Sequence, residues 1–214
     1  MHIVIAGNIG SGKTTLTQML ARHYGWTARM ESVAHNPYLE DYYKDMRRWA
    51  LNLEVFFLKE RFRDLLAISR SKRTIVQDRS IYEGVYIFTA NNHDMGNMSD
   101  RDFDTYMGLF DSMMLVAKTP DLMVYLKASL PHLVTNIQLR GRSYEQNMRM
   151  DYLKQLNDRY DYFIEKQYQG RCITINVDGL DFLHNRQDFE GIVARLDQQI
   201  RLIEHKDFNL FNNL

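Results

Sequence analysis

The N-terminal residues combine a short apolar run with a glycine-rich segment, and this combination constrains the fold more than any other feature. Residues 2–6 (HIVIA) are typical of a strand buried on both faces of a parallel sheet. The run leads into GNIGSGKT at residues 7–14, which fits the pattern G-x-x-x-x-G-K-[ST]. Residues 14–23 then carry apolar side chains at helical spacing. A strand, a glycine turn and a helix in this order predict the first half of a βαβ unit.

Phosphate chemistry explains the residue types in this glycine-rich segment. The glycines let backbone N–H groups converge on phosphate oxygens at a helix N-terminus, Lys13 would reach the β and γ phosphates, and Thr14 would offer its hydroxyl to Mg²⁺. A glycine turn that merely packs is the alternative, which the position between strand and helix disfavours. We therefore predict that a nucleoside triphosphate such as ATP binds here. The residues assigned to it are Gly7, Asn8, Ile9, Gly10, Ser11, Gly12, Lys13, Thr14 and Thr15.

Buried-strand and helical patterns alternate along the rest of the chain. Strand patterns recur at 74–77, 122–126 and 173–177, and helical patterns occupy 49–69, 81–90, 103–117 and 150–167. We predict a single α/β domain over residues 1–214, a doubly wound parallel sheet flanked by helices. The polar segment 91–99 lacks periodicity and is predicted to be a surface loop, with Ser99 capping the next helix.

Charge and cysteine content exclude several functions. The 27 Lys and Arg residues balance 27 Asp and Glu residues, so the chain lacks the electrostatic footprint of a protein that coats a nucleic acid polymer or an anionic membrane. No stretch approaches the roughly 18 apolar residues of a membrane span. The single Cys172 cannot form an internal disulfide or a thiolate metal cage, and this favours a reduced, cytoplasmic protein.

Two further segments could serve phosphoryl transfer, which needs a carboxylate near the metal and cations for the negative charge. Asp78 and Arg79 follow the strand at 74–77, where the carboxyl edge of a sheet would present them to phosphates. Arg140 and Arg142 flank a glycine, which suggests a mobile lid rather than a stiff helix. A solvated, salt-bridged surface is the alternative for either pair.

The chain resembles a known family through ordered matches over nearly its whole length. This family is the deoxynucleoside kinases of the thymidine kinase 2, deoxycytidine kinase and deoxyguanosine kinase type, and the resemblance is closest to the bacterial deoxyadenosine/deoxyguanosine kinases. The matching segments are GNIGSGKTT, ESV with Glu31, NPYLEDYY, FFLKERF, DRSIYEG, LRGRSYEQ and Asp181-Phe182. The resemblance implies a P-loop kinase fold with an arginine-bearing lid, ATP with Mg²⁺ as donor, and a homodimer.

The resemblance also implies roles around the transferred phosphate. Glu31 matches the general base that accepts the proton of the nucleoside 5′-OH. Arg79 matches the arginine that holds this base and the 5′ oxygen, and Asp78 looks like the acid on the metal side, together with Thr14. Arg140 and Arg142 match lid arginines that close over the phosphate. The residues predicted to be catalytic are Glu31, Arg79 and Lys13.

Further matches concern the sugar and the two bases. Tyr43 and Glu145 match the pair that hydrogen-bonds the sugar 3′-OH, although a tyrosine in such an aromatic segment could equally be packing. Arg61 matches the arginine deep in the acceptor-base pocket. Asp181 and Phe182 match the loop around the base of the donor.

Three positions depart from the family pattern. In this sequence the family's base-reading glutamine is replaced by Glu54, an acid of the pocket by Gly84, and a further lid arginine by Asn136. An ionised Glu54 can only accept hydrogen bonds, which favours a base that presents amino or imino hydrogens, and Gly84 leaves room for a larger ring. Both point to a purine deoxynucleoside, deoxyadenosine first, with deoxyguanosine and deoxycytidine still possible. Glu54 could instead pair with Arg61, which is two helical turns away.

The leading hypothesis is therefore an ATP- and Mg²⁺-dependent kinase that phosphorylates the 5′-OH of a deoxynucleoside in salvage. A P-loop nucleoside monophosphate kinase is the first alternative, but an acidic Glu31 would repel its anionic acceptor. A non-catalytic nucleotide-binding regulator is the second, and it has no need of Glu31, Tyr43 and Glu145 together. The helices at 81–90 and 103–117 are the predicted donors of a dimer surface.

Overall fold

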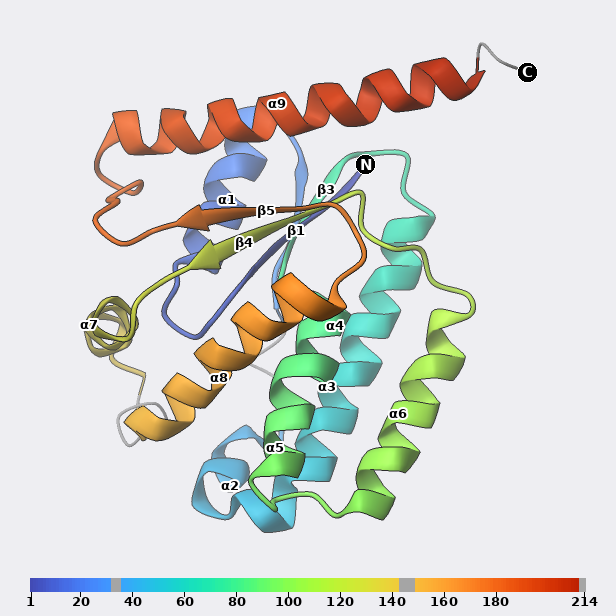
Figure 1. The fold of residues 1–214 in the computed structure, drawn as a ribbon, viewed down its shortest axis with the longest axis vertical. Coiled ribbons are helices and arrows are strands. Elements are labelled where there is room, and N and C mark those ends of the chain that lie inside the picture. Colours follow the sequence, from blue (N-terminus) through green and yellow to red (C-terminus); the bar gives the residue numbers. More distant parts are fainter. Residues whose placement is uncertain (32–35, 143–148, 212–214) are drawn as a thin grey trace.

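A five-stranded parallel sheet forms the centre of the protein (Figure 1). The computed structural model describes residues 1–31, 36–142 and 149–211. The strand order is β2-β3-β1-β4-β5, so β1 is the middle strand. The strands are β1 (His2–Gly7), β2 (Thr27–Arg29), β3 (Ile75–Asp78), β4 (Leu122–Lys127) and β5 (Cys172–Asn176). The sequence prediction is confirmed for four of them to within one residue at each end; β2, which is short and partly exposed, has no counterpart in it.

Helices cover both faces of the sheet, as predicted for a doubly wound fold. Ile3 and Ile5 of β1 pack on one face with α1, α7 and α9, whereas Val4 and Ala6 pack on the other face with α8 and η1. All four side chains are fully buried, which is why the strand is apolar without alternation. The helical elements are α1 (Lys13–Tyr24), α2 (Leu39–Lys44), α3 (Met46–Ser69), α4 (Ile81–Glu83), the π-helical η1 (Gly84–Thr89), α5 (Ala90–Asp94), α6 (Asp100–Met114), α7 (Leu130–Arg140), α8 (Met150–Tyr162), the π-helical η3 (Phe163–Gln167) and α9 (Arg186–Phe211).

The strand register brings the functional loops to one edge of the sheet. Ile5 of β1 is paired with Asp78 of β3, and Gly7 is paired with Leu126 of β4. Because parallel strands end at the same edge, the turn after β1 and the turn after β3 lie next to each other. This edge is therefore where phosphates and acceptor can meet.

The sequence prediction of a surface loop at 91–99 is wrong for residues 91–94, whereas residues 95–99 connect α5 to α6. The helical run that starts at Ile81 continues through α5 to Asp94, and Asn91 and Asn92 are each only 1% exposed. Polar side chains can be buried when they are hydrogen-bonded, and Asn92 is bonded to α2 and α3. Ser99 caps α6 as predicted, with its Oγ accepting from the N–H of Asp102 at 3.2 Å.

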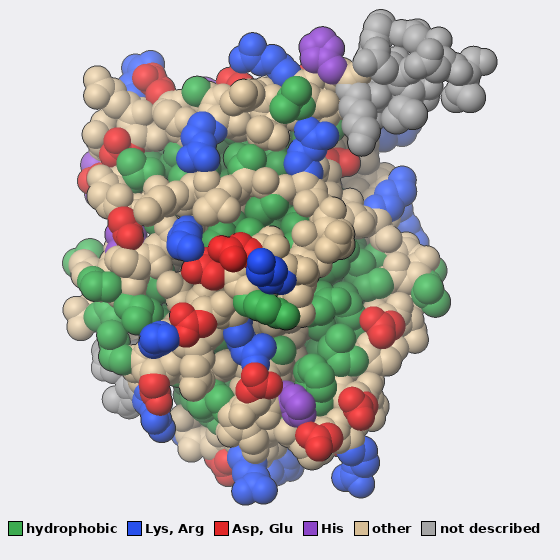
Figure 2. All heavy atoms as spheres, viewed as in Figure 1, with side chains coloured by type: hydrophobic (Ala, Val, Ile, Leu, Met, Phe, Trp, Pro, Cys, Tyr) green, Lys and Arg blue, Asp and Glu red, His purple; other side chains and the backbone are tan. Residues whose placement is uncertain are grey.

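The surface carries a mixture of charges. Basic and acidic side chains are interspersed over the face shown in Figure 2, while hydrophobic side chains gather over α4, η1 and α6. Across the described ranges, no helix is both long and apolar enough to cross a membrane.

Candidate active site

The glycine-rich turn between β1 and α1 has the conformation expected of a P-loop. Gly10 and Gly12 both have φ near +90°, a region that favours glycine. They also lack space for a side chain, because a Cβ at Gly10 would lie 2.6 Å from the carbonyl oxygen of Leu133 and one at Gly12 would lie 2.8 Å from the ring of Phe182. Backbone conformation and packing therefore both require glycine here.

Lys13 is folded back over the P-loop. Its Nζ donates to the carbonyl oxygen of Asn8 at 2.8 Å. Burial, reinforced by the charge of Arg79, lowers the pKa of Lys13 to about 8. A desolvated ammonium group surrounded by backbone donors is suited to an anionic ligand, since a phosphate would supply the missing counter-charge.

Two of the residues assigned to ATP, Gly7 and Asn8, are hydrogen-bonded to other parts of the protein. The side chain of Asn8 is 1% exposed and donates to the carbonyl oxygen of Leu153 and to Oδ1 of Asn157, both in α8. The backbone N–H of Gly7 donates to Oε1 of Glu83 at 3.2 Å. These groups fasten the P-loop to the helix and the turn that surround it.

Thr14 and Asp78 meet at the carboxyl ends of β1 and β3. Thr14 Oγ1 donates to Asp78 Oδ2 at 2.6 Å, and Oδ1 of Asp78 is buried with no hydrogen-bond partner among the described residues. Burial raises the pKa of Asp78 above its usual value, although the charge of Lys13 opposes this shift. A hydroxyl and a carboxylate oxygen side by side are hard ligands of the type that Mg²⁺ prefers when substrate phosphates complete its shell. Within the described ranges, no group of three or more His, Cys, Asp or Glu residues is arranged so that it could hold a metal ion.

Arg79 has a left-handed backbone with φ of 68°, unusual for a residue other than glycine. Its N–H donates to the carbonyl oxygen of Ile5 at 3.0 Å, which fixes the turn against β1. The guanidinium is 4.4 Å from the centre of the Phe88 ring, and Nη1 donates to the hydroxyl of Tyr160 at 3.3 Å. Strain of this kind is typical of functional sites, where surrounding bonds hold the residue in place.

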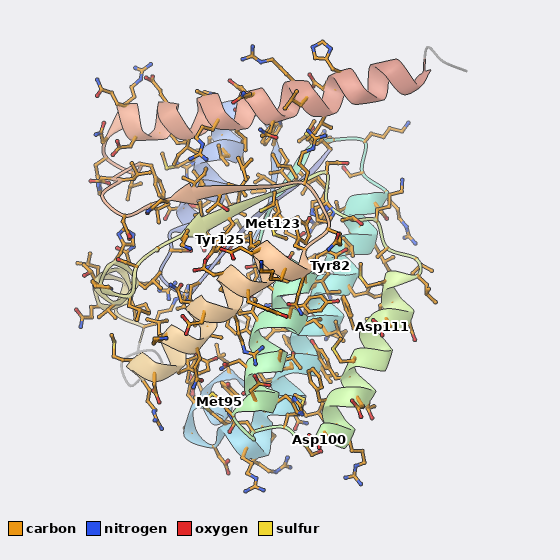
Figure 3. All side chains as sticks on the ribbon, in the orientation of Figure 1. Tyr82, Met95, Asp100, Asp111, Met123 and Tyr125 are labelled. Carbon is orange, nitrogen blue, oxygen red and sulfur yellow. The ribbon has the colours of Figure 1, made fainter. Side chains whose placement is uncertain are left out.

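Glu83 joins the turn after β3 to the P-loop, a role that the sequence analysis missed. It is fully buried, and its carboxylate accepts from the N–H of Gly7, the N–H of Ser80 and the hydroxyl of Tyr160. Tyr160 in turn stacks on Tyr125 of β4, which Figure 3 labels. The S-x-x-E spacing from Ser80 to Glu83 is a capping-box pattern, and this signal could have identified Glu83.

Glu31 follows β2 and lies between two arginines. Its Oε1 accepts from Nη2 of Arg61 at 2.5 Å and is 3.3 Å from Nε of Arg79. Burial alone would raise the pKa of Glu31, but the charges of Arg79 and Arg61 outweigh it and lower the pKa to about 2. Glu31 is therefore ionised at physiological pH.

A cavity of about 230 Å³ opens in front of Glu31. Its wall is part charged and part aromatic, and Tyr43 contributes to it. Glu145 lies outside the described residues. The residues that line the cavity are Ile9, Lys13, Thr14, Met30, Glu31, Leu39, Tyr42, Tyr43, Leu53, Glu54, Phe57, Arg61, Asp78, Arg79, Phe88, Arg140, Arg142 and Tyr152.

Glu54 lies in this cavity wall and forms no ion pair with any cation of the described residues. It is 2% exposed and accepts from the hydroxyl of Thr89 at 3.2 Å and from Nδ2 of Asn92 at 3.0 Å. The alternative of a Glu54–Arg61 pair is not observed, because Arg61 reaches Glu31 instead. Burial raises the pKa of Glu54 to about 7. This corrects the premise that Glu54 is simply ionised. Thr89 and Asn92 escaped the sequence analysis because a sequence does not show which polar side chains reach Glu54.

Gly84 does not leave room for a larger acceptor ring. A Cβ at Gly84 would lie 2.5 Å from Nη1 of Arg61, so the arginine occupies the space that a side chain would need. The sequence argument treated the missing side chain as an empty volume. In the structure, Gly84 instead allows Arg61 to extend towards Glu31.

A second cavity of about 610 Å³ lies on the other side of the P-loop. It brings together the predicted donor residues Arg140, Arg142, Asp181 and Phe182, and Arg140 and Arg142 line both cavities. Asn136, which stands where the family has a lid arginine, donates from Nδ2 to the carbonyl oxygen of Gly10 at 2.7 Å. Its role here is to tie α7 to the P-loop.

Comparison with known proteins gives a consistent result. A family model described as "Deoxynucleoside kinase" matches residues 3–201. The chain is 36% identical over 196 residues to a deoxyadenosine/deoxycytidine kinase of Bacillus subtilis, covering 91% of this chain and 90% of that protein. It is 32% identical over 206 residues to a deoxyguanosine kinase of the same organism, covering 92% and 97%. The solved structure of a deoxyadenosine kinase from M. mycoides with bound dATP superposes with a TM-score of 0.82 at 29% identity, covering 92% of this chain and 100% of that one.

Proposed function

The chain belongs to the deoxynucleoside kinase family and is a phosphotransferase, and we propose that it transfers the γ-phosphoryl group of ATP to the 5′-OH of a deoxynucleoside in salvage. The observation that carries this proposal is the meeting of the two cavities. Lys13, Thr14, Arg140 and Arg142 line both, so a triphosphate on the P-loop would end where the acceptor cavity begins. Glu31 stands in the wall of the acceptor cavity.

Glu31 suits a neutral hydroxyl as acceptor. An ionised carboxylate only accepts hydrogen bonds, so it orients the 5′-OH and takes its proton as the oxygen attacks the γ-phosphorus. A phosphate dianion has no proton to offer and would be repelled by the same charge, which disfavours a monophosphate kinase. Phosphoryl transfer depends mainly on positioning and charge stabilisation, so Glu31 need not be a strong base.

Cations on three sides of the junction would stabilise the transferring phosphoryl group. Lys13 comes from the P-loop, Arg79 from the turn after β3, and Arg140 and Arg142 from the end of α7. We propose that the arginines after α7 act as a lid. Thr14 and Asp78 would hold Mg²⁺, which would supply positive charge to offset that of the phosphates.

The remaining assignments concern specificity. We propose that Tyr43 and Glu145 contact the sugar 3′-OH, that Glu54 and Arg61 face the acceptor base, and that Asp181 and Phe182 border the donor base. A purine, with deoxyadenosine first, is the proposed acceptor. The supporting facts are that one relative is named for deoxyadenosine and deoxycytidine, another for deoxyguanosine, and that a neighbouring structure holds dATP. The space argument at Gly84 no longer contributes.

A homodimer and a cytoplasmic location complete the proposal. The dimer surface would be the apolar face over α4, η1 and α6, where hydrophobic side chains gather in Figure 2; Tyr82 and Asp111, labelled in Figure 3, lie on α4 and α6. The location rests on the single Cys172.

The direct test is ADP release from ATP and Mg²⁺ with each deoxynucleoside and each deoxynucleoside monophosphate as acceptor. We expect release with deoxynucleosides, fastest with deoxyadenosine, and loss of it in Lys13→Ala, which removes the cation over the β and γ phosphates. Faster release with monophosphates would identify a monophosphate kinase. ATP binding without release for any acceptor would identify a regulator.

A further inference from the structure

Glu54 is a buried acid whose hydrogen-bond partners are all neutral. Oε1 accepts from the amide of Asn92 and Oε2 from the hydroxyl of Thr89. Asn92 is held in turn, since its Oδ1 accepts from the hydroxyl of Tyr42 at 2.8 Å and from Nδ2 of Asn97 at 3.2 Å. The carboxyl group is thus fixed in orientation at the wall of the acceptor cavity.

Two cations of the cavity wall form their contacts with Glu31 rather than with Glu54. Arg61 and Arg79 both contact Glu31, and within the described ranges no Lys, Arg or His nitrogen lies within ion-pair distance of Glu54. The charged and titratable groups that face Glu54 from the neighbouring elements are therefore two guanidinium groups, both in contact with Glu31, and three tyrosine hydroxyls. They are Arg61, Arg79, Tyr42, Tyr106 and Tyr152.

Burial without an ion pair favours the protonated carboxyl. It raises the pKa of Glu54 to about 7, although Arg61 and the two hydrogen bonds from Thr89 and Asn92 oppose the shift. Near neutral pH the acid and the carboxylate are both populated. The two forms have different hydrogen-bonding patterns, since the acid has a donor and an acceptor whereas the carboxylate has only acceptors.

These patterns match different purines. Adenine presents an amino donor beside a ring-nitrogen acceptor, which an amide such as glutamine recognises and a carboxylic acid can recognise in the same way. Guanine presents adjacent N1–H and N2–H₂ donors, which a carboxylate accepts from in pairs. We propose that Glu54 reads the acceptor base in two protonation states, so that low pH favours deoxyadenosine and high pH favours deoxyguanosine. This inference rests on the proposed kinase function.

The experiment is the kcat/KM for deoxyadenosine and for deoxyguanosine, with ATP saturating, from about pH 5.5 to about pH 8.5 on either side of neutrality. ADP is quantified directly, so that no coupling enzyme adds its own pH dependence. The ratio of the two values cancels effects common to both substrates, such as titration of Lys13 or of ATP. We expect the deoxyadenosine-to-deoxyguanosine ratio to fall about tenfold across this range, because a good bidentate pair discriminates by about that factor or more.

Two variants test the assignment to Glu54. Glu54→Gln keeps a donor and an acceptor at every pH, so its ratio should be constant and in favour of deoxyadenosine. Glu60→Gln, on the same helix but outside the acceptor cavity, should keep the native slope. Should Glu54→Gln fail to fold, Thr89→Val serves instead: it removes a hydrogen bond that favours the charged form, so the midpoint should move to higher pH.

The outcomes separate this inference from the proposed function. Phosphorylation of deoxynucleosides with a flat native ratio, or an unchanged slope in Glu54→Gln, would overturn the two-state reading of the base while leaving the kinase intact. No phosphorylation of any deoxynucleoside at any pH would overturn the proposed function itself.

Discussion

Two glutamates line the acceptor cavity: Glu31 lies between two guanidinium groups, whereas Glu54 accepts, among the described residues, only from a hydroxyl and an amide. Burial acts on both carboxyls in the same direction and raises their pKa. Yet the pKa of Glu31 is about 2 and that of Glu54 is about 7. The difference arises because Arg79, with the larger effect, and Arg61 both contact Glu31, whereas neither lies within ion-pair distance of Glu54. Which acid an arginine reaches, rather than depth alone, sets the charge along this cavity.

Replacement of Glu31 should have the largest effect, a loss of catalytic activity. Glu31→Gln removes the acceptor of the 5′-OH proton but leaves the P-loop unchanged, so kcat should fall by roughly 10²–10⁴-fold while ATP binding is retained. Steady-state ADP release gives kcat, and titration calorimetry with ATP gives the affinity. A variant with near-native kcat would show that Glu31 is not the proton acceptor.

Replacement of Glu54 should increase the stability of the protein, by an amount that depends on pH. A carboxyl whose folded pKa is raised loses stability as pH rises from 4.5 towards 7, because the unfolded chain ionises first. Glu54→Gln removes this penalty and should stabilise the protein above neutral pH by roughly 3 kcal/mol, since the folded pKa of about 7 exceeds the ordinary 4.5 and one pKa unit is about 1.4 kcal/mol. Below about pH 4.5 the gain should vanish. Denaturant unfolding across this pH range measures both.

Glu60→Gln is the matched control for the stability measurement. Glu60 lies on the same helix, but Lys59 and Arg63 contact its carboxylate, and the bond from Lys59, helped by Arg63, lowers its pKa. Its stabilising contribution is present above the unfolded pKa, so Glu60→Gln should be neutral or slightly destabilising at high pH. Equal stabilisation by the two substitutions would contradict the difference in environment.

A smaller effect is expected where Gly84 makes room for the arginine. In Gly84→Ala the new Cβ would meet Nη1 of Arg61, so the guanidinium has to shift from Glu31 while Arg79 remains. We expect the KM for the deoxynucleoside to rise about threefold with the KM for ATP unchanged, because only one of two charge-assisted contacts is weakened. Gly108→Ala, on α6 with open space around it, is the control and should leave both constants unchanged.

Periodicity and apolar runs predicted the sheet and the P-loop because these depend on local pattern. The strand at residues 2–6 is buried on both faces and reads as such in the sequence. The same reasoning failed for residues 91–94, where the side chain of Asn92 is bonded to α2 and α3, which are distant in sequence. It failed at Gly84 too, because a sequence gives no indication of which long side chain enters a space. The assignments of Tyr43 and Glu145 to the sugar remain predictions.

Arg79 restricts how this turn can change in evolution. A left-handed backbone costs a residue with a Cβ roughly 1–2 kcal/mol, and glycine would remove that cost. Glycine, however, would abolish the guanidinium that contacts Glu31 and Tyr160. Lysine would keep the charge but neither relieve the backbone nor reproduce the planar group. No single substitution satisfies both the main chain and the side chain, so drift at position 79 would need simultaneous changes among its partners.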